Sequence, residues 1–75
     1  MTQFYIIEIQ KNIQSEYSHL VHWAFDEDPT KARLKAESTY HTILAAAAVS
    51  DLPQHSASLL ASDGRCIMYQ CYTKE

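Results

Sequence analysis

The chain contains four histidines, the residue type that most often moves protons or binds metal ions near neutral pH. His19 and His22 are three residues apart, so in a strand their side chains would face opposite sides of a sheet. His41 and His55 lie farther along, and no HxxxH, CxxC or carboxylate–histidine motif accompanies any of the four. We therefore expect no metal site, and we predict solvated or hydrogen-bonded imidazoles, with Glu37 and His41 able to pair four residues apart on a helix.

The two cysteines and the serines are candidate nucleophiles, but none stands in a catalytic motif. Cys66 and Cys71 have only Arg65 as a basic neighbour, and the serines occupy no nucleophile elbow. Five residues apart on one strand, the cysteines point to opposite faces and cannot form a disulfide with each other. A single glycine in the chain leaves no glycine-rich loop for phosphates. We expect buried, unreactive cysteines, no cofactor and no catalytic activity.

A third group of side chains offers aromatic faces, hydrogen-bonding edges and a cation, the parts that hold a nucleotide-like anion. A chain of 75 residues is too small to enclose such a ligand, so we expect the site at a symmetric interface between copies. Tyr40 also has the spacing of a core residue on a helix, which leaves a purely structural role open for it. The candidate ligand-binding residues are Tyr40, His41, Ser50, His55, Arg65 and Tyr72, with Tyr69 as an alternative to Tyr72.

Composition limits the class of protein and of partner. With 75 residues, 47% of them hydrophobic, the chain predicts one folded domain, residues 1–75, whose small core needs support from a disulfide, a metal or a partner. Six Lys and Arg against nine Asp and Glu give a net charge of −3, which disfavours nucleic acid as a partner. No apolar stretch approaches the roughly 20 residues that span a bilayer, and no signal peptide is recognisable. We expect a cytoplasmic protein that does not bind membranes.

The first third of the chain predicts a β-hairpin. Residues 3–10 alternate in the manner of a strand, with β-branched and aromatic side chains, and residues 17–25 do the same. Their connection contains Asn12 but no glycine, which favours a loop of about three to five residues over a two-residue turn. The second strand places Tyr17, His19, Val21, Trp23 and Phe25 on one face.

A long helix and a second hairpin complete the predicted order. Asp28 before Pro29 is a helix start, because the carboxylate accepts from free backbone N–H groups and proline loses nothing at the first position. The helix is expected from Pro29 to Val49, followed by strands at 55–61 and 65–73 that are joined by a turn with a positive φ at Gly64. This is an α+β fold, β-β-α-β-β, with one long helix on one face of a four-stranded, mainly antiparallel sheet.

One helix covers only one face of a sheet, yet both predicted faces carry apolar groups. Phe4 and Ile6 oppose Tyr5, Ile7 and Ile9 on the first strand. The helix segment 43–49, ILAAAAV, is likewise apolar around its whole circumference, which is typical of a helix buried on all sides. We therefore expect a homo-oligomer formed through the end of the helix, the outer face of the sheet, or both. The predicted interface residues are Leu44, Ala45, Ala46, Ala48, Val49 and Met68.

An alternative explanation of the alanine run stays open, because alanine is the best helix former and tolerates exposure. It does not explain strands that are aromatic on both faces, and so we favour self-association.

Taken together, YIIEIQ at 5–10, the helix string at 36–50 with Glu37, Tyr40 and His41, the strand at His55 and the ending up to Tyr72 resemble short uncharacterised proteins of phages and prophages of Firmicutes. The resemblance covers nearly the whole chain, although this chain has a longer insert, FDEDPTKARLK, before the helix string. It implies no activity for any residue. It implies only a small accessory protein of phage origin, located in the host cytoplasm.

Two functions compete under that expectation. The first is a homo-oligomer that binds and sequesters a small, anionic, nucleotide-like signalling ligand of the host's immunity. The second is a protein–protein interaction module, such as an inhibitor of a host protein or a part associated with the virion.

Overall fold

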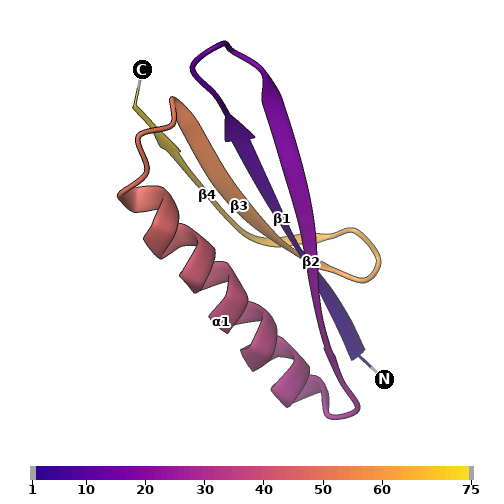
Figure 1. Cartoon of the computed structure of the whole chain (residues 1–75). Coiled ribbons are helices and arrows are strands. Elements are labelled where there is room, and N and C mark those ends of the chain that lie inside the picture. Colours follow the sequence, from indigo (N-terminus) through magenta and orange to yellow (C-terminus); the bar gives the residue numbers. More distant parts are fainter. Residues whose placement is uncertain (1, 75) are drawn as a thin grey trace.

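The computed structural model describes residues 2–74 as a β-β-α-β-β chain in which one helix packs on one face of a four-stranded sheet (Figure 1). The strands are β1 (Thr2–Lys11), β2 (Tyr17–Asp26), β3 (Gln54–Ala61) and β4 (Cys66–Thr73), and the helix is α1 (Pro29–Ala48). This confirms the predicted fold. The predicted helix end, Val49, is the residue that caps the helix.

The sheet has the order β2-β1-β3-β4, and every neighbouring pair is antiparallel. β1 therefore lies between β2 and β3, although β3 follows it by more than forty residues in the sequence. In register, Ile6 pairs with His22 on one side and with Leu59 on the other. Residues far apart in the chain thus share one face in the middle of the sheet.

The two hairpin loops use different devices to turn the chain. Between β1 and β2, the Asn12 carboxamide oxygen accepts from the backbone N–H groups of Gln14 and Glu16 at 2.9 and 3.0 Å. Ser15 supplies the positive φ of 64° that the absent glycine would otherwise provide. Between β3 and β4, Gly64 has a φ of 90°, as predicted.

The helix begins where the sequence predicts and packs closely on the sheet. The Asp28 carboxylate accepts from the backbone N–H of Thr30 at 2.9 Å, and Pro29 occupies the first turn. Several residues in contact are alanines, whose small side chains let the helix backbone approach the strands. The buried hydrophobic core consists of Phe4, Ile6, Ala24, Ala32, Ala36, Tyr40, Ile43, Ala47, Ala57 and Leu59. Leu44, Ile67 and Met68 pack against its edge.

α1 lies against one face of the sheet only (Figure 1). We call the opposite face the outer sheet face, and no other element within residues 2–74 packs on it. By strand alternation it carries Tyr5, Ile7 and Ile9 of β1, Tyr17, His19, Val21, Trp23 and Phe25 of β2, Ser56, Ser58 and Leu60 of β3, and Tyr69 and Cys71 of β4. The predicted apolar character of both faces is confirmed.

The cysteines differ from the expectation. Cys66 is exposed and Cys71 is half-buried, and both are free thiols. The prediction of buried cysteines was wrong for Cys66 because the pairing shifts register between Leu59 and Leu60, at the end of the sheet next to the hairpin loop. β4 is also an edge strand, covered by the helix less than the other strands.

Candidate functional site

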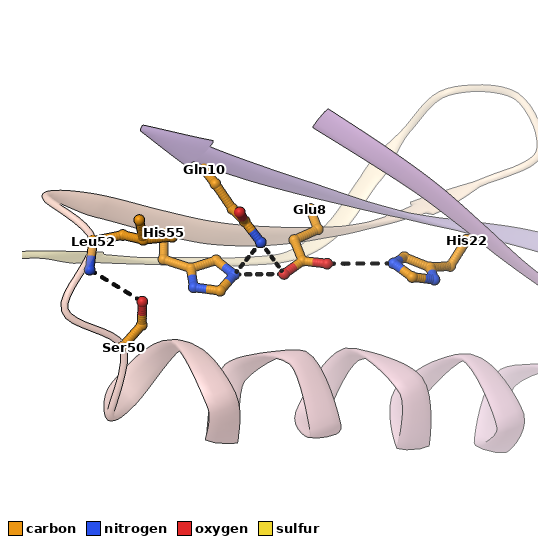
Figure 2. Close-up of polar contacts among 6 residues, drawn as sticks. All are labelled: Glu8, Gln10, His22, Ser50, Leu52 and His55. Carbon is orange, nitrogen blue, oxygen red and sulfur yellow. Dashed lines mark hydrogen bonds and ion pairs between the residues drawn. The ribbon is translucent and has the colours of Figure 1, made fainter. Parts of the chain in front are cut away.

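A polar cluster on the helix side of the sheet centres on the carboxylate of Glu8 (Figure 2). One carboxylate oxygen lies 2.5 Å from Nε2 of His55 on β3, and the other lies 3.4 Å from Nε2 of His22 on β2. The Gln10 side-chain amide donates to the same oxygen as His55, at 3.0 Å. A single carboxylate on the central strand thereby joins three strands on the helix side of the sheet.

The hydrogen bonds of Glu8 outweigh the cost of burying its charge. Burial by itself raises the pKa of Glu8, but hydrogen bonds from His55, Gln10 and His22 bring that pKa below its ordinary value of 4.5. The carboxylate is therefore ionised at neutral pH, and a distance of 2.5 Å to His55 requires the imidazole to donate from Nε2.

His55 is the most enclosed member of the cluster, with 5% of its surface exposed. Its second ring nitrogen, Nδ1, is buried and has no hydrogen-bond partner among the described residues. A buried nitrogen in that state is destabilising unless a water molecule or ligand reaches it.

The cluster shows neither a metal centre nor a nucleophilic triad. No group of three or more His, Cys, Asp or Glu side chains within residues 2–74 is arranged to hold a metal ion. Both histidines direct Nε2 at the carboxylate, and none of the three hydrogen bonds to Glu8 from the described residues involves a serine or cysteine. Its evident role is to satisfy buried polar groups between the sheet and the helix.

This carboxylate–histidine cluster was not predicted from the sequence, because His22 and His55 are 14 and 47 positions from Glu8. The available signal was Glu8 itself, a carboxylate that alternation places on the same face as Phe4 and Ile6. The predicted pairing of Glu37 with His41 also fails. Glu37 instead accepts from Nε of Arg33 at 2.7 Å, and His41 meets the ring of Tyr40 edge-on.

Three of the six predicted ligand-binding residues, His55, Tyr72 and Ser50, lie toward the same end of the sheet. His55 and Tyr72 are register partners on β3 and β4, and Ser50 lies just beyond the helix end, near His55 (Figure 2). Tyr40 is in the core; burial, with Cys66 and Tyr72 acting in the same direction, raises the pKa of Tyr40 and keeps its phenol neutral. The Ser50 hydroxyl accepts from the backbone N–H of Leu52 at 3.1 Å.

The other two ligand candidates are not joined to that group within one chain. Arg65 follows the far end of β3, and six residues at about 3.3 Å each put Ala61 roughly 20 Å from His55. His41 is exposed on the helix. The one carboxylate in the His55 group, Glu8, is ionised and repels an anion.

The predicted interface residues divide into two sets. Leu44 and Met68 are half-buried and pack against the core of their own chain. The other four form the exposed side of the helix end, where only Ala47 of the alanine run is buried. These exposed residues are Ala45, Ala46, Ala48 and Val49.

The outer sheet face is the larger exposed apolar surface. Trp23 is 61% exposed there, and Tyr17, Phe25, Val21 and Tyr69 are also exposed. The two carboxylates within the described strands point to the helix side instead, since Glu8 bonds to His55 and Asp26 bonds to Lys35 of α1. A chain of net charge −3 thus keeps strand carboxylates off this face.

Comparison with known proteins gives no match to a protein-family model, to a curated protein or to a solved structure. Among the described residues, no helix has the length and apolar character needed to cross a membrane. What the chain does must therefore be inferred from its own geometry.

Proposed function

We propose that this chain is a non-catalytic protein-interaction module that works as a homodimer, with the outer sheet face as its binding surface. The observation that carries the proposal is an aromatic sheet face left uncovered in a small domain, with exposed Trp23, Tyr17, Phe25 and Tyr69. Tyr, Trp and Phe are the residues that dominate the binding energy of protein interfaces. Exposed apolar patches of this kind mark interaction sites.

The charge distribution favours a second copy as the partner. Two identical faces meet without repulsion only if neither carries a concentration of like charge, and here the strand carboxylates lie on the other side. Lys11, at the edge of the face, lies with its ammonium 5.9 Å from the ring centroid of Tyr17. An interaction with the Cys71 side chain raises the pKa of Tyr69, which keeps that phenol uncharged.

The size of the face reaches the minimum expected of a biological interface. Strands about 4.8 Å apart with a rise of about 3.3 Å per residue give a four-stranded face of roughly 500–600 Å². Two such faces bury roughly 1,000–1,200 Å² in total, at the low end of specific interfaces. Aligned sheets pack about 10 Å apart, which lets these aromatic side chains interdigitate.

Two matched substitutions test this assignment. Val21→Glu puts a charge on the outer sheet face, midway along the edge strand β2, and Leu34→Glu puts the same charge on an exposed apolar residue of the helix. We expect light scattering to show a monomer for Val21→Glu and a dimer for Leu34→Glu and for the wild type. A dimer that persists in Val21→Glu contradicts the assignment. A third variant, Ala46→Glu, puts the same charge on the exposed side of the helix end. If only this variant is a monomer, the interface lies at the helix end instead.

Sequestration of a small nucleotide-like anion is the second candidate. Nδ1 of buried His55 has no hydrogen-bond partner among residues 2–74, which favours a polar ligand there, and Tyr72 is the register partner of His55. The ionised Glu8 and the distance to Arg65 weigh against an anion within one chain, so this ranks behind the interaction module. A thermal shift with a nucleotide panel tests it, since a ligand at 100 times its Kd adds about 2.7 kcal/mol to stability. His41→Ala and Arg65→Ala should abolish such a shift.

A host-directed role follows from the sequence resemblance alone. Under it, the module would act in the host cytoplasm, as an inhibitor of a host protein or as a part associated with the virion. Co-purification from infected and uninfected host cells distinguishes a host target from a virion component.

A further inference from the structure

A knob and a hollow lie side by side on the outer sheet face. The knob is Trp23, whose ring meets Tyr5 edge-on with centroids 6.2 Å apart and planes at 84°. This contact restricts the orientation of the exposed indole, which lowers the entropy lost when a partner binds it. Trp23 is also the only tryptophan in the chain.

The hollow lies toward the β1–β2 loop. It has a volume of about 390 Å³ and is lined by Ile7, Ile9, Tyr17, Ser18 and His19. The accessible surface of the hollow is almost entirely apolar. The outer-face side chains around it are those of Ile7, Ile9, Tyr17 and His19, because alternation directs the Ser18 side chain to the helix side of the sheet. The apolar body of an indole fits such a surface.

The register of the hairpin relates the knob to the hollow. Tyr5 pairs with Trp23, Ile7 with Val21, and Ile9 with His19. The knob and the Ile9–His19 pair thus lie two residues on either side of the central pair, each about 6–7 Å from it. Consider two copies whose outer sheet faces meet, related by a two-fold axis that lies between the sheets, perpendicular to the strands, at the Ile7–Val21 pair. This rotation puts Trp23 of one copy over His19 of the other.

We infer that in the homodimer Trp23 of each copy fills the hollow of the other. The symmetry makes the two contacts equal, as an isologous interface requires. This inference rests on the proposed function, because it assumes that the outer sheet faces meet. It adds the register in which they meet and names the residue that dominates the affinity.

A double-mutant cycle on the dimer dissociation constant tests the contact. Within one chain, Trp23 and Ile9 are offset by four residues along paired strands, or roughly 13 Å, so their effects on folding are independent. We expect Trp23→Ala to weaken the dimer about 30-fold, as an interface hot spot does. In the double variant Trp23→Ala, Ile9→Ala, the loss should be clearly smaller than the product of the two single losses.

The matched control is a second cycle in which Tyr69→Ala takes the place of Trp23→Ala. Tyr69 is an equally exposed aromatic residue on β4 and does not line the hollow. The fold-changes that Tyr69→Ala and Ile9→Ala cause in the dimer dissociation constant should multiply in the double variant. If the fold-changes caused by Trp23→Ala and Ile9→Ala also multiply while the wild type is a dimer, the inferred register is wrong and the proposed function stands. If the wild type is a monomer throughout, both are wrong.

Fluorescence of the unmodified protein gives a second test that needs no variant. As the concentration rises through the dissociation constant, the emission of Trp23 should shift to shorter wavelength, because the indole leaves water. A mass that doubles with no shift in emission overturns the inference, since Trp23 would then remain exposed in the dimer.

Discussion

Nε2 of His55 lies 2.5 Å from a carboxylate oxygen of Glu8, across 47 residues of sequence and between two neighbouring strands. The two residues are buried under the helix to a similar degree, with 7% and 12% of their side-chain surfaces exposed. A charged acceptor and a buried donor at this distance make a strong hydrogen bond. The contact fixes β3 against β1 at the point where the helix end covers them.

Glu8→Gln tests what the charge of that acceptor contributes. The variant keeps an oxygen for His55 but loses the charge, so we expect the free energy of unfolding to fall by about 1 kcal/mol. Urea unfolding at neutral pH and a single protein concentration measures it. The control is Glu37→Gln, whose half-exposed pair with Arg33 is worth no more than about 0.5 kcal/mol. Equal losses in the two variants contradict the account.

The pH dependence of stability should carry the signature of Glu8. Burial raises and three hydrogen bonds lower the pKa of Glu8, with a net position below 4.5 in the folded state. Its contribution is therefore present above the unfolded value of 4.5 and is lost as the pH falls through the lower folded pKa.

Unfolding free energies between about pH 5 and pH 3 should consequently fall less steeply in Glu8→Gln than in the wild type. A residual slope belongs to Asp26, whose pKa is lowered by its hydrogen bond from Lys35. Parallel curves for the variant and the wild type would show that Glu8 titrates normally in the folded state.

Local signals and side-chain alternation were enough to predict most of the fold. Asp28 followed by Pro29 starts the helix, Gly64 turns the second hairpin, and the period of two assigns Phe4 and Ile6 to the face opposite Tyr5 and Ile7. Each of these depends on residues a few positions apart.

The Glu8 cluster depends on which strands are neighbours, and this is not a local property. Only the order β2-β1-β3-β4 brings His22 and His55 to the two sides of one carboxylate. For Glu37 the sequence predicted His41, four residues later, as the partner, and Arg33 lies four residues earlier. In the structure Glu37 pairs with Arg33, whose guanidinium is always charged, and not with His41.

The helix start should depend on its cap. Asp28→Ala removes the acceptor for the backbone N–H of Thr30, and we expect a loss of about 1 kcal/mol in the free energy of unfolding. Asp51→Ala, an exposed aspartate outside the helix and strands, is the control for the loss of charge and should change stability by less than about 0.5 kcal/mol. Circular dichroism with denaturant measures both. An unaffected Asp28→Ala would mean that the cap is not formed in solution.

Neighbouring alanines in the run at 45–48 should respond in opposite ways to enlargement. Ala47 is fully buried against the sheet, so Ala47→Leu overpacks the core and should cost roughly 1–3 kcal/mol. Ala46 is exposed, so Ala46→Leu should change stability by no more than about 0.5 kcal/mol. Thermal unfolding of the two variants compares them directly. A similar cost for both would mean that position 46 is also enclosed, as an interface at the helix end requires.

Sedimentation equilibrium of the unmodified protein over a wide range of concentrations tests the central claim most directly. If the outer sheet face is a binding surface for a second copy, the mass should rise to twice the 8.6 kDa of the chain and stop there. A mass of 8.6 kDa at every concentration at which the protein is soluble would contradict the homodimer and the Trp23 contact inferred from it.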